Sequence, residues 1–247
     1  RILKLIEPEI KDHPDLEELN SLTEKDNVLG MISGTVKEMT ELFPEEERSR
    51  QPSVFSVIRT IFKLFRSDDP YLGLYGAFGY DLVFQFETIQ AKHQRHTDQS
   101  DLHLFLPVEM VVVDRQKEEA NKIEFHIKTP IGMTESWWNT GTEYSVVSGN
   151  ADGEIQCDHE IGEFEKKVSK IRNDCRRGDF YEVVLSQTFS TGFNDLPSKL
   201  FGRICEQNPS PYSFLINMGQ EQLVGASPEM YVRIKEDRFE TSPISGT

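Results

Sequence analysis

The clearest feature of the sequence is an amphipathic helix, which we predict for residues 159–177. Its apolar residues recur at helical spacing and share one stripe: Ile161, Phe164, Val168, Ile171 and Cys175. Two arginines and then Gly178 follow, a pattern that is typical of the end of a helix. The fold class then depends on the segments around this helix.

Strands and one further helix come next along the chain. Residues 179–190 predict a strand, and Pro197–Gln207 predict a helix. Residues 211–217 and 222–225 predict two more strands around a short turn. Helix, strand, helix and then hairpins are typical of an α+β domain with mixed or antiparallel sheets.

The last stretch of the chain predicts a hairpin with a polar group at each end. Residues 230–234 and 239–244 form its strands, with a charged turn between them. Glu229 places a carboxylate before the first strand, and residues 245–247 (Ser-Gly-Thr) offer N–H groups and a hydroxyl after the second. Such a pair suits a substrate that is held by its carboxylates and protonated on one oxygen. An ordinary strand start and turn would explain the same residues.

The N-terminal half is less regular. We expect loose structure over the first fifty residues, which are mostly polar and acidic, and a helix over Ser53–Phe65 with Ser53 as its cap. Glycines at 73, 76 and 79 predict close backbone approach or a bend, because their spacing is not that of a phosphate-binding loop. Residues 102–114, broken at Pro107, and residues 122–127 predict strands.

Composition excludes several classes of function. The net charge of −15 argues against nucleic acid and anionic membranes as partners, and no apolar run reaches the roughly 18 residues of a membrane span. Cys157, Cys175 and Cys205 share no metal-ligand spacing. They predict free, buried thiols in a reducing cytoplasm. The first residue is not Met, so we expect a piece of a longer protein.

Residues 225–229 (Gly-Ala-Ser-Pro-Glu) followed by 243–247 (Pro-Ile-Ser-Gly-Thr) resemble the chorismate-utilising enzymes. Residues 74–81 (Leu-Tyr-Gly-Ala-Phe-Gly-Tyr-Asp) resemble anthranilate synthase component I, especially its single-chain form fused to a glutamine amidotransferase. The resemblance implies two packed antiparallel or mixed β-sheets flanked by helices. It also implies three regions: an N-terminal component I region over 1–133, a linker over 134–157, and the truncated first part of a chorismate-binding domain over 158–247.

The resemblance also assigns roles to residues. Glu229 matches the acid that protonates the leaving C4 hydroxyl of chorismate, and Thr247 belongs to the catalytic loop. Ser245, Gly246, Thr247 and Glu182 match substrate-binding positions. Related enzymes that use a lysine as the nucleophile, or to activate water, carry it at position 245 or 182. Because this chain has Ser245 and Glu182, ammonia is the expected nucleophile.

A second motif, residues 208–213 (Asn-Pro-Ser-Pro-Tyr-Ser), resembles the tryptophan feedback site of this family. The resemblance implicates Asn208, Pro211, Tyr212 and Ser213 in binding L-tryptophan, although Ser213 replaces the family's methionine. Two prolines pre-set the backbone, and Tyr212 offers an aromatic face. A rigid turn with no ligand explains the same residues equally well.

The resemblance therefore implies an anthranilate synthase that converts chorismate and ammonia to anthranilate and pyruvate in tryptophan biosynthesis. It further implies Mg²⁺ as cofactor, with its ligands beyond Thr247, and a glutamine amidotransferase domain or subunit as partner. A cytoplasmic homo-oligomer is expected, and the chain by itself is expected to be inactive. Two alternatives stay open: an aminodeoxyisochorismate synthase of phenazine biosynthesis, and a non-catalytic module that binds tryptophan.

Overall fold

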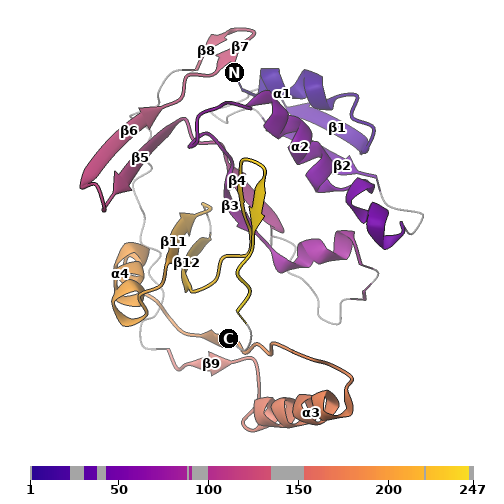
Figure 1. Cartoon of the computed structure of the whole chain (residues 1–247), viewed down its shortest axis with the longest axis vertical. Coiled ribbons are helices and arrows are strands. Elements are labelled where there is room, and N and C mark those ends of the chain that lie inside the picture. The colour runs from indigo at the N-terminus through magenta and orange to yellow at the C-terminus, as the bar shows by residue number, and fades with distance from the viewer. Residues whose placement is uncertain are drawn as a thin grey trace. The chain divides into compact units, whose positions relative to one another are not determined.

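The structure is a computed structural model that describes residues 2–22, 31–37, 43–87, 89–90, 100–134, 153–219 and 221–244. The chain divides into two compact units, residues 1–141 and 142–247. Among the described residues the strands pair two at a time in seven antiparallel sheets, accompanied by helices (Figure 1). The predicted α+β class is therefore confirmed. Most of the predicted linker lies outside the described residues.

The first unit opens with regular structure, so the expectation of loose structure over the first fifty residues is wrong. Helix α1 (Leu3–Ile10) is followed by the hairpin of β1 (Leu16–Leu22) and β2 (Met31–Val36), and then by the 3-10 turn η1 (Glu45–Arg50). Ile10 is only 5% exposed, and α1 contacts helix α2 (Val54–Leu64). The stabilising partner of α1 is thus distant in sequence, and the local pattern does not contain it.

A glycine allows two backbones to approach closely in the next sheet, as predicted. Strand β3 (Tyr75–Phe78) pairs with β4 (Leu102–Phe105), and the 3-10 turn η2 (Tyr80–Gln85) follows β3. A β-carbon on Gly76 would lie 1.9 Å from the carbonyl oxygen of His103. No side chain fits at that distance, so this position requires glycine.

Helix α2 begins where the sequence predicts, but a different residue caps it. Ser53 occupies the N-cap position with extended backbone, and its side chain makes no capping hydrogen bond. Instead, Oε1 of Gln85 accepts a 3.0 Å hydrogen bond from the N–H of Val54. Nε2 of Gln51, a residue that is 2% exposed, donates to the carbonyl oxygen of Gln85 at 2.6 Å. The two glutamines therefore join α2 to η2 in the core.

The first unit ends with two further hairpins. Strand β5 (Glu109–Asp114) pairs with β6 (Glu119–Glu124), and β7 (Lys128–Thr129) pairs with β8 (Gly132–Met133). Because β4 ends before Pro107 and β5 begins after it, the predicted break is confirmed. Strand β6 begins three residues earlier than predicted. No helix in the described part of the chain is both long and apolar enough to cross a membrane.

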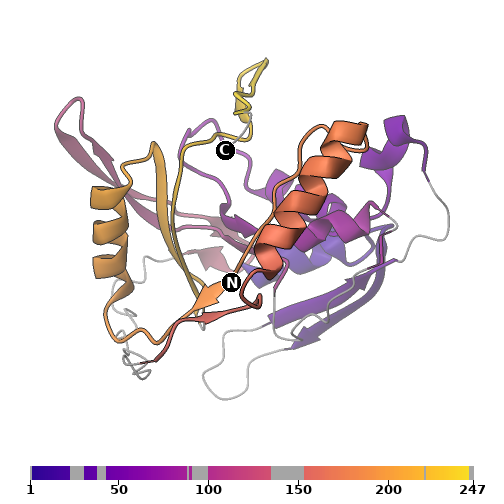
Figure 2. The ribbon, with the colours of Figure 1, turned by 90° about the horizontal axis from the view of Figure 1, so that it is seen from below.

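The second unit contains the predicted long helix, α3 (Glu163–Arg177), which Figure 2 shows as one uninterrupted coil. It starts four residues later than predicted, because Gly162 has the left-handed φ of +79°. Gly178 ends it with φ +87°, and its N–H donates to the carbonyl oxygen of Cys175. The N–H of Asp179 reaches the carbonyl of Asp174, which completes a Schellman motif.

The strand predicted for residues 179–190 is mostly wrong. Only β10 (Phe189–Ser190) is a strand, and it pairs with the equally short β9 (Gln156–Cys157). The residues before it are extended but largely exposed; Tyr181 and Val184 are 104% and 77% exposed. Their β-branched pattern lacks a described neighbouring strand with which to form a ladder.

The helix and the first hairpin that come next follow the prediction closely. Helix α4 (Pro197–Gln207) packs on the hairpin of β11 (Tyr212–Asn217) and β12 (Gln222–Ser227), as Figures 1 and 2 show. A second hairpin, β13 (Arg233–Lys235) and β14 (Arg238–Glu240), completes the described chain. Its strands are three residues each, shorter than the predicted strands 230–234 and 239–244, and its turn of two residues is shorter than the predicted four-residue turn.

Candidate active site

The candidate site begins at the open end of the β11–β12 hairpin. The register pairs the first residue of β11, Tyr212, with the last residue of β12, Ser227. The N–H of Met218 donates to the carbonyl of Glu221 at 2.9 Å, which closes the opposite end of the hairpin. The register therefore places the motif that starts at Asn208 beside the motif that contains Glu229.

A local turn presents Glu229 directly after β12. The hydroxyl of Ser227 accepts a hydrogen bond from the N–H of Glu229 at 3.2 Å and donates one to its carbonyl oxygen at 3.3 Å. Pro228 has no N–H and cannot continue the ladder. Serine and proline together end the strand, and the carboxylate of Glu229 projects from an exposed position.

The next hairpin returns the chain to this carboxylate. Oε1 of Glu229 accepts a 3.2 Å hydrogen bond from the N–H of Ile244, fifteen residues later. Near the base of the hairpin, the hydroxyl of Thr241 donates to the carbonyl of Tyr231 at 2.9 Å. The described chain therefore ends, at Ile244, in direct contact with the Glu229 carboxylate.

An ion pair fixes the arms of this returning hairpin. Nε of Arg233 lies 3.0 Å from a carboxylate oxygen of Glu240, its partner in the strand register. The Glu240 carboxylate, with a smaller contribution from Tyr212, raises the pKa of the Arg233 guanidinium. Both side chains are at least half exposed, so the pair sets geometry more than it stabilises the fold.

The structure describes only some of the predicted substrate-binding residues. Ser245, Gly246 and Thr247 lie outside the described residues, although the described chain ends at the residue before them. Glu182 is exposed in the extended segment that leads to β10. The structure therefore gives the orientation of Glu229 and of the chain up to Ile244.

The four predicted tryptophan-binding residues follow the chain from the end of α4, through the turn after it, to the first residues of β11. Asn208 ends α4, and its N–H donates to the carbonyl of Ile204 at 2.8 Å. The hydroxyl of Ser213 donates to the carbonyl of Ser210 at 3.2 Å, across Pro211. Tyr212 keeps 42% of its surface exposed. The turn is thus held by its own hydrogen bonds, with an aromatic ring available.

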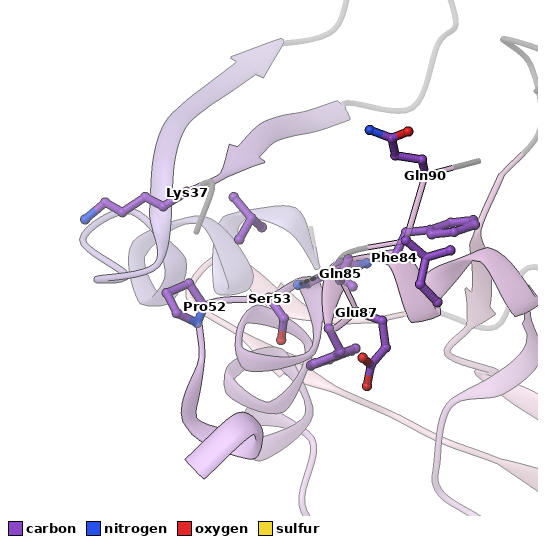
Figure 3. A pocket seen from close by; sticks show the side chains of 11 residues that line it. Lys37, Pro52, Ser53, Phe84, Gln85, Glu87 and Gln90 are labelled. Atoms are coloured by element: carbon purple, nitrogen blue, oxygen red, sulfur yellow. Dashed lines mark hydrogen bonds between the residues drawn. The ribbon is translucent and has the colours of Figure 1, made fainter. Parts of the chain in front are cut away.

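A cavity of about 660 Å³ lies elsewhere, within the first unit (Figure 3). It contains none of the predicted site residues. Its walls are formed by β2, the start of α2 and the end of η2: Val36, Lys37, Pro52, Ser53, Val54, Phe84, Gln85, Phe86, Glu87, Ile89 and Gln90. We therefore place the candidate chemistry at Glu229, where the motif residues meet.

Sequence reasoning missed one polar cluster. Cys157, Asp158 and His159 bring three possible metal ligands within 4.8 Å of one another. Cys157 is exposed, so its predicted burial is wrong. The sequence signal for this cluster is that three possible metal ligands follow one another directly. Within the described ranges this is the group that meets the geometry of a metal site, and its sulfur and nitrogen donors do not suit Mg²⁺, which prefers oxygen ligands.

Comparison with known proteins assigns the chain to an enzyme family. The profile of the chorismate binding enzyme family matches residues 19–247. The chain therefore belongs to the chorismate binding enzymes. The solved structure of anthranilate synthase component I from Streptococcus pneumoniae TIGR4 shares its fold, with a TM-score of 0.56 at 20% identity. That match covers 91% of this chain and 53% of the other.

Two curated relatives narrow the resemblance within this family. The chain is 47% identical over 206 residues to an anthranilate synthase from Azospirillum brasilense, covering 83% of this chain and 28% of that protein. It is 29% identical over 195 residues to anthranilate synthase component 1 from Acetivibrio thermocellus, covering 71% and 39%. The resemblance to anthranilate synthase component I is thereby confirmed. The chain spans well under half the length of either relative.

Proposed function

We propose that the protein containing this chain is an anthranilate synthase, and that this chain supplies the general acid of its chorismate site. The observation that carries the proposal is the hydrogen bond from the N–H of Ile244 to the carboxylate of Glu229. It joins the acid of one motif to the residue that directly precedes Ser245 in the other. This contact between two segments fifteen residues apart supports a shared site for the two motifs.

The proposed reaction adds ammonia at C2 of chorismate while the C4 hydroxyl leaves as water. Elimination of pyruvate and loss of the C2 proton then give the aromatic ring of anthranilate. Hydroxide is a poor leaving group, so an acid at C4 lowers the barrier. Because one oxygen of Glu229 accepts the N–H of Ile244, the other carboxyl oxygen is the one that delivers the proton. The same hydrogen bond limits rotation of the carboxyl group.

The identities of two residues support ammonia as the nucleophile. Ser245 has no side-chain amine that could add at C2, and the carboxylate of Glu182 cannot replace an activating lysine. The A. brasilense relative also supports a fused glutaminase as the source of ammonia. Matches of similar length cover 28% of that protein and 39% of the A. thermocellus component 1, so the former is the longer chain. A glutamine amidotransferase domain would account for the extra length.

We also assign Mg²⁺ as cofactor and L-tryptophan as inhibitor. Bound Mg²⁺ would offset the carboxylate charge of chorismate. The group of possible metal ligands in the described part of the chain contains a sulfur and a nitrogen donor, so we expect the oxygen ligands of Mg²⁺ to come from other residues. For tryptophan, the support is the exposed ring of Tyr212 and its register partner Ser227, which holds the backbone of Glu229. A ligand on that turn could shift the acid.

Replacing Glu229 by glutamine in the full-length protein tests the assignment. Glutamine keeps an oxygen that can accept the Ile244 N–H but cannot donate a carboxyl proton, so chorismate should still bind. Turnover should fall by roughly 10²- to 10⁴-fold, the usual contribution of general acid–base catalysis. The matched control is Glu236→Gln, an exposed glutamate in the turn of the same region.

The outcome separates the alternatives. Near-normal turnover in Glu229→Gln would remove the acid role. Release of aminodeoxyisochorismate without pyruvate by the unmodified protein would identify the phenazine-type synthase instead. Tryptophan binding with no consumption of chorismate would favour the regulatory module.

A further inference from the structure

Three different metal-ligating side chains meet where β9 turns toward α3. Asp158 and His159 share a 2.5 Å contact between Oδ1 and Nδ1, and Sγ of Cys157 lies 3.8 Å from the same Oδ1. Cys157 and Asp158 are exposed, whereas the side chain of His159 is 10% exposed. The cluster is therefore open to solvent on its sulfur and oxygen side and anchored on its imidazole side.

Neighbouring residues hold each of these groups in place. Nε2 of Gln187 donates to Sγ of Cys157 at 3.1 Å, and the N–H of His159 donates to the same sulfur at 3.4 Å. The ring of Phe164 meets the His159 imidazole edge to face, with centroids 5.6 Å apart. Two N–H groups directed at this one sulfur fix the position of the Cys157 side chain, whose deprotonated form is the one that binds metals.

We propose that Cys157, Asp158 and His159 form a binding site for a borderline divalent cation, Zn²⁺ or Co²⁺. Thiolate, imidazole and carboxylate are the ligands that Zn²⁺ takes in proteins, and three of them leave a fourth position open to water. The donor set separates this site from one for Mg²⁺, which demands oxygen ligands. This inference does not depend on the proposed enzyme activity.

The hydrogen bonds indicate what changes when the metal enters. Lys167 Nζ lies 3.0 Å from Nε2 of His159; an ammonium only donates, so the imidazole proton is on Nδ1 and is donated to Asp158. Metal binding at Nδ1 displaces this proton to Nε2 and releases the thiol proton of Cys157. Tetrahedral zinc keeps nitrogen and oxygen ligands roughly 3.4 Å apart, so Asp158 and His159 separate by about 1 Å.

Lys167 opposes this rearrangement, because it donates a hydrogen bond to Nε2 of His159. Once Nε2 carries a proton, the ammonium can no longer donate to it. Lys167 has an alternative partner on its own helix, Oε1 of Glu163 at 2.8 Å. Removing the lysine charge should therefore favour the metal-bound state. A bound metal would connect β9 to the first turns of α3 through the same His159.

Titration of the full-length protein with Co²⁺ tests the site. We expect one equivalent to produce a near-ultraviolet sulfur-to-cobalt charge-transfer band that Zn²⁺ abolishes and millimolar Mg²⁺ does not. Cys157→Ser should remove the band, and because Cys157 is exposed the variant should fold. Cys205→Ser, a change at a half-buried cysteine in α4, is the matched control and should keep the band.

Two further variants distinguish ligation from mere proximity. His159→Gln should weaken Co²⁺ binding at least tenfold, while Lys167→Met should strengthen it by about tenfold, the scale of a single outer-shell contact. Circular dichroism confirms that each variant is folded. Absence of the band in the unmodified protein, or its persistence in Cys157→Ser, would overturn the proposal.

Discussion

Replacing Gly76 by alanine should destabilise the first unit far more than the same change at Gly73. A β-carbon at Gly76 would lie 1.9 Å from the backbone oxygen of His103 and 3.0 Å from the α-carbon of Leu104. Both atoms are backbone, so strands β3 and β4 must separate by more than 1 Å. The nearest atom to a β-carbon on Gly73 is a ring carbon of Tyr75 at 3.8 Å, which is an ordinary contact.

The expected loss of stability follows from the contacts that are disrupted when β3 and β4 separate. Overpacking costs about 1–3 kcal/mol, and the loss of one or two ladder hydrogen bonds adds roughly 1 kcal/mol each. We expect Gly76→Ala to cost about 2–5 kcal/mol, offset by about 0.4–1 kcal/mol from the stiffer unfolded chain. Gly73→Ala should be neutral or slightly stabilising, because only the stiffening of the unfolded chain applies to it.

Thermal unfolding followed by circular dichroism measures the difference. For a chain of this size, we expect the Tm of Gly76→Ala to fall by about 5–10 °C relative to Gly73→Ala. Gly225→Ala is an informative intermediate, because the atoms nearest to its β-carbon belong to the exposed ring of Phe214, the first at 2.4 Å. A ring can rotate where a backbone cannot. Equal Tm values for the Gly73 and Gly76 variants would refute the backbone-approach argument.

Two other predictions concern the helix cap and the acidic pH range. Gln85→Ala should lower the free energy of unfolding in urea by about 1 kcal/mol, because it removes the acceptor for the Val54 N–H. Ser53→Ala should lower it less, because the Ser53 side chain makes no capping hydrogen bond. The reverse order would contradict the assigned cap. Hydrogen bonding to His159 lowers the pKa of Asp158 to about 2, so its stabilising contribution is present above the ordinary carboxyl pKa and disappears as pH falls through about 2. Carboxyl NMR should find that pKa raised in His159→Gln, and an unchanged pKa would contradict the assigned cause.

Helices were predictable here because their signals are local. The apolar stripe of α3 and the left-handed Gly178 are contained within one segment, and so is the proline at the start of α4. The prediction failed for α1, whose burial depends on α2 more than forty residues later. It failed again over residues 179–188, where a β-branched pattern has no described partner strand.

The candidate site was predictable only in its residue types. The sequence identifies Glu229 and the segment after Ile244 as chemically useful, and the structure adds a hydrogen bond from the N–H of Ile244 to the Glu229 carboxylate. That bond depends on where the β13–β14 hairpin returns, which strand propensity alone does not determine. The pairing of Tyr212 with Ser227 likewise depends on register. The cluster at Cys157 was missed because spacing rules look for cysteine pairs.

The most direct test of the proposed function is product analysis with the full-length protein. The protein is incubated with chorismate, Mg²⁺ and an ammonium salt, and the products are separated while anthranilate fluorescence is followed. We predict equal amounts of anthranilate and pyruvate, with both products lost in Glu229→Gln and retained in Glu236→Gln. Chorismate that remains unconsumed by the unmodified protein would contradict the proposal.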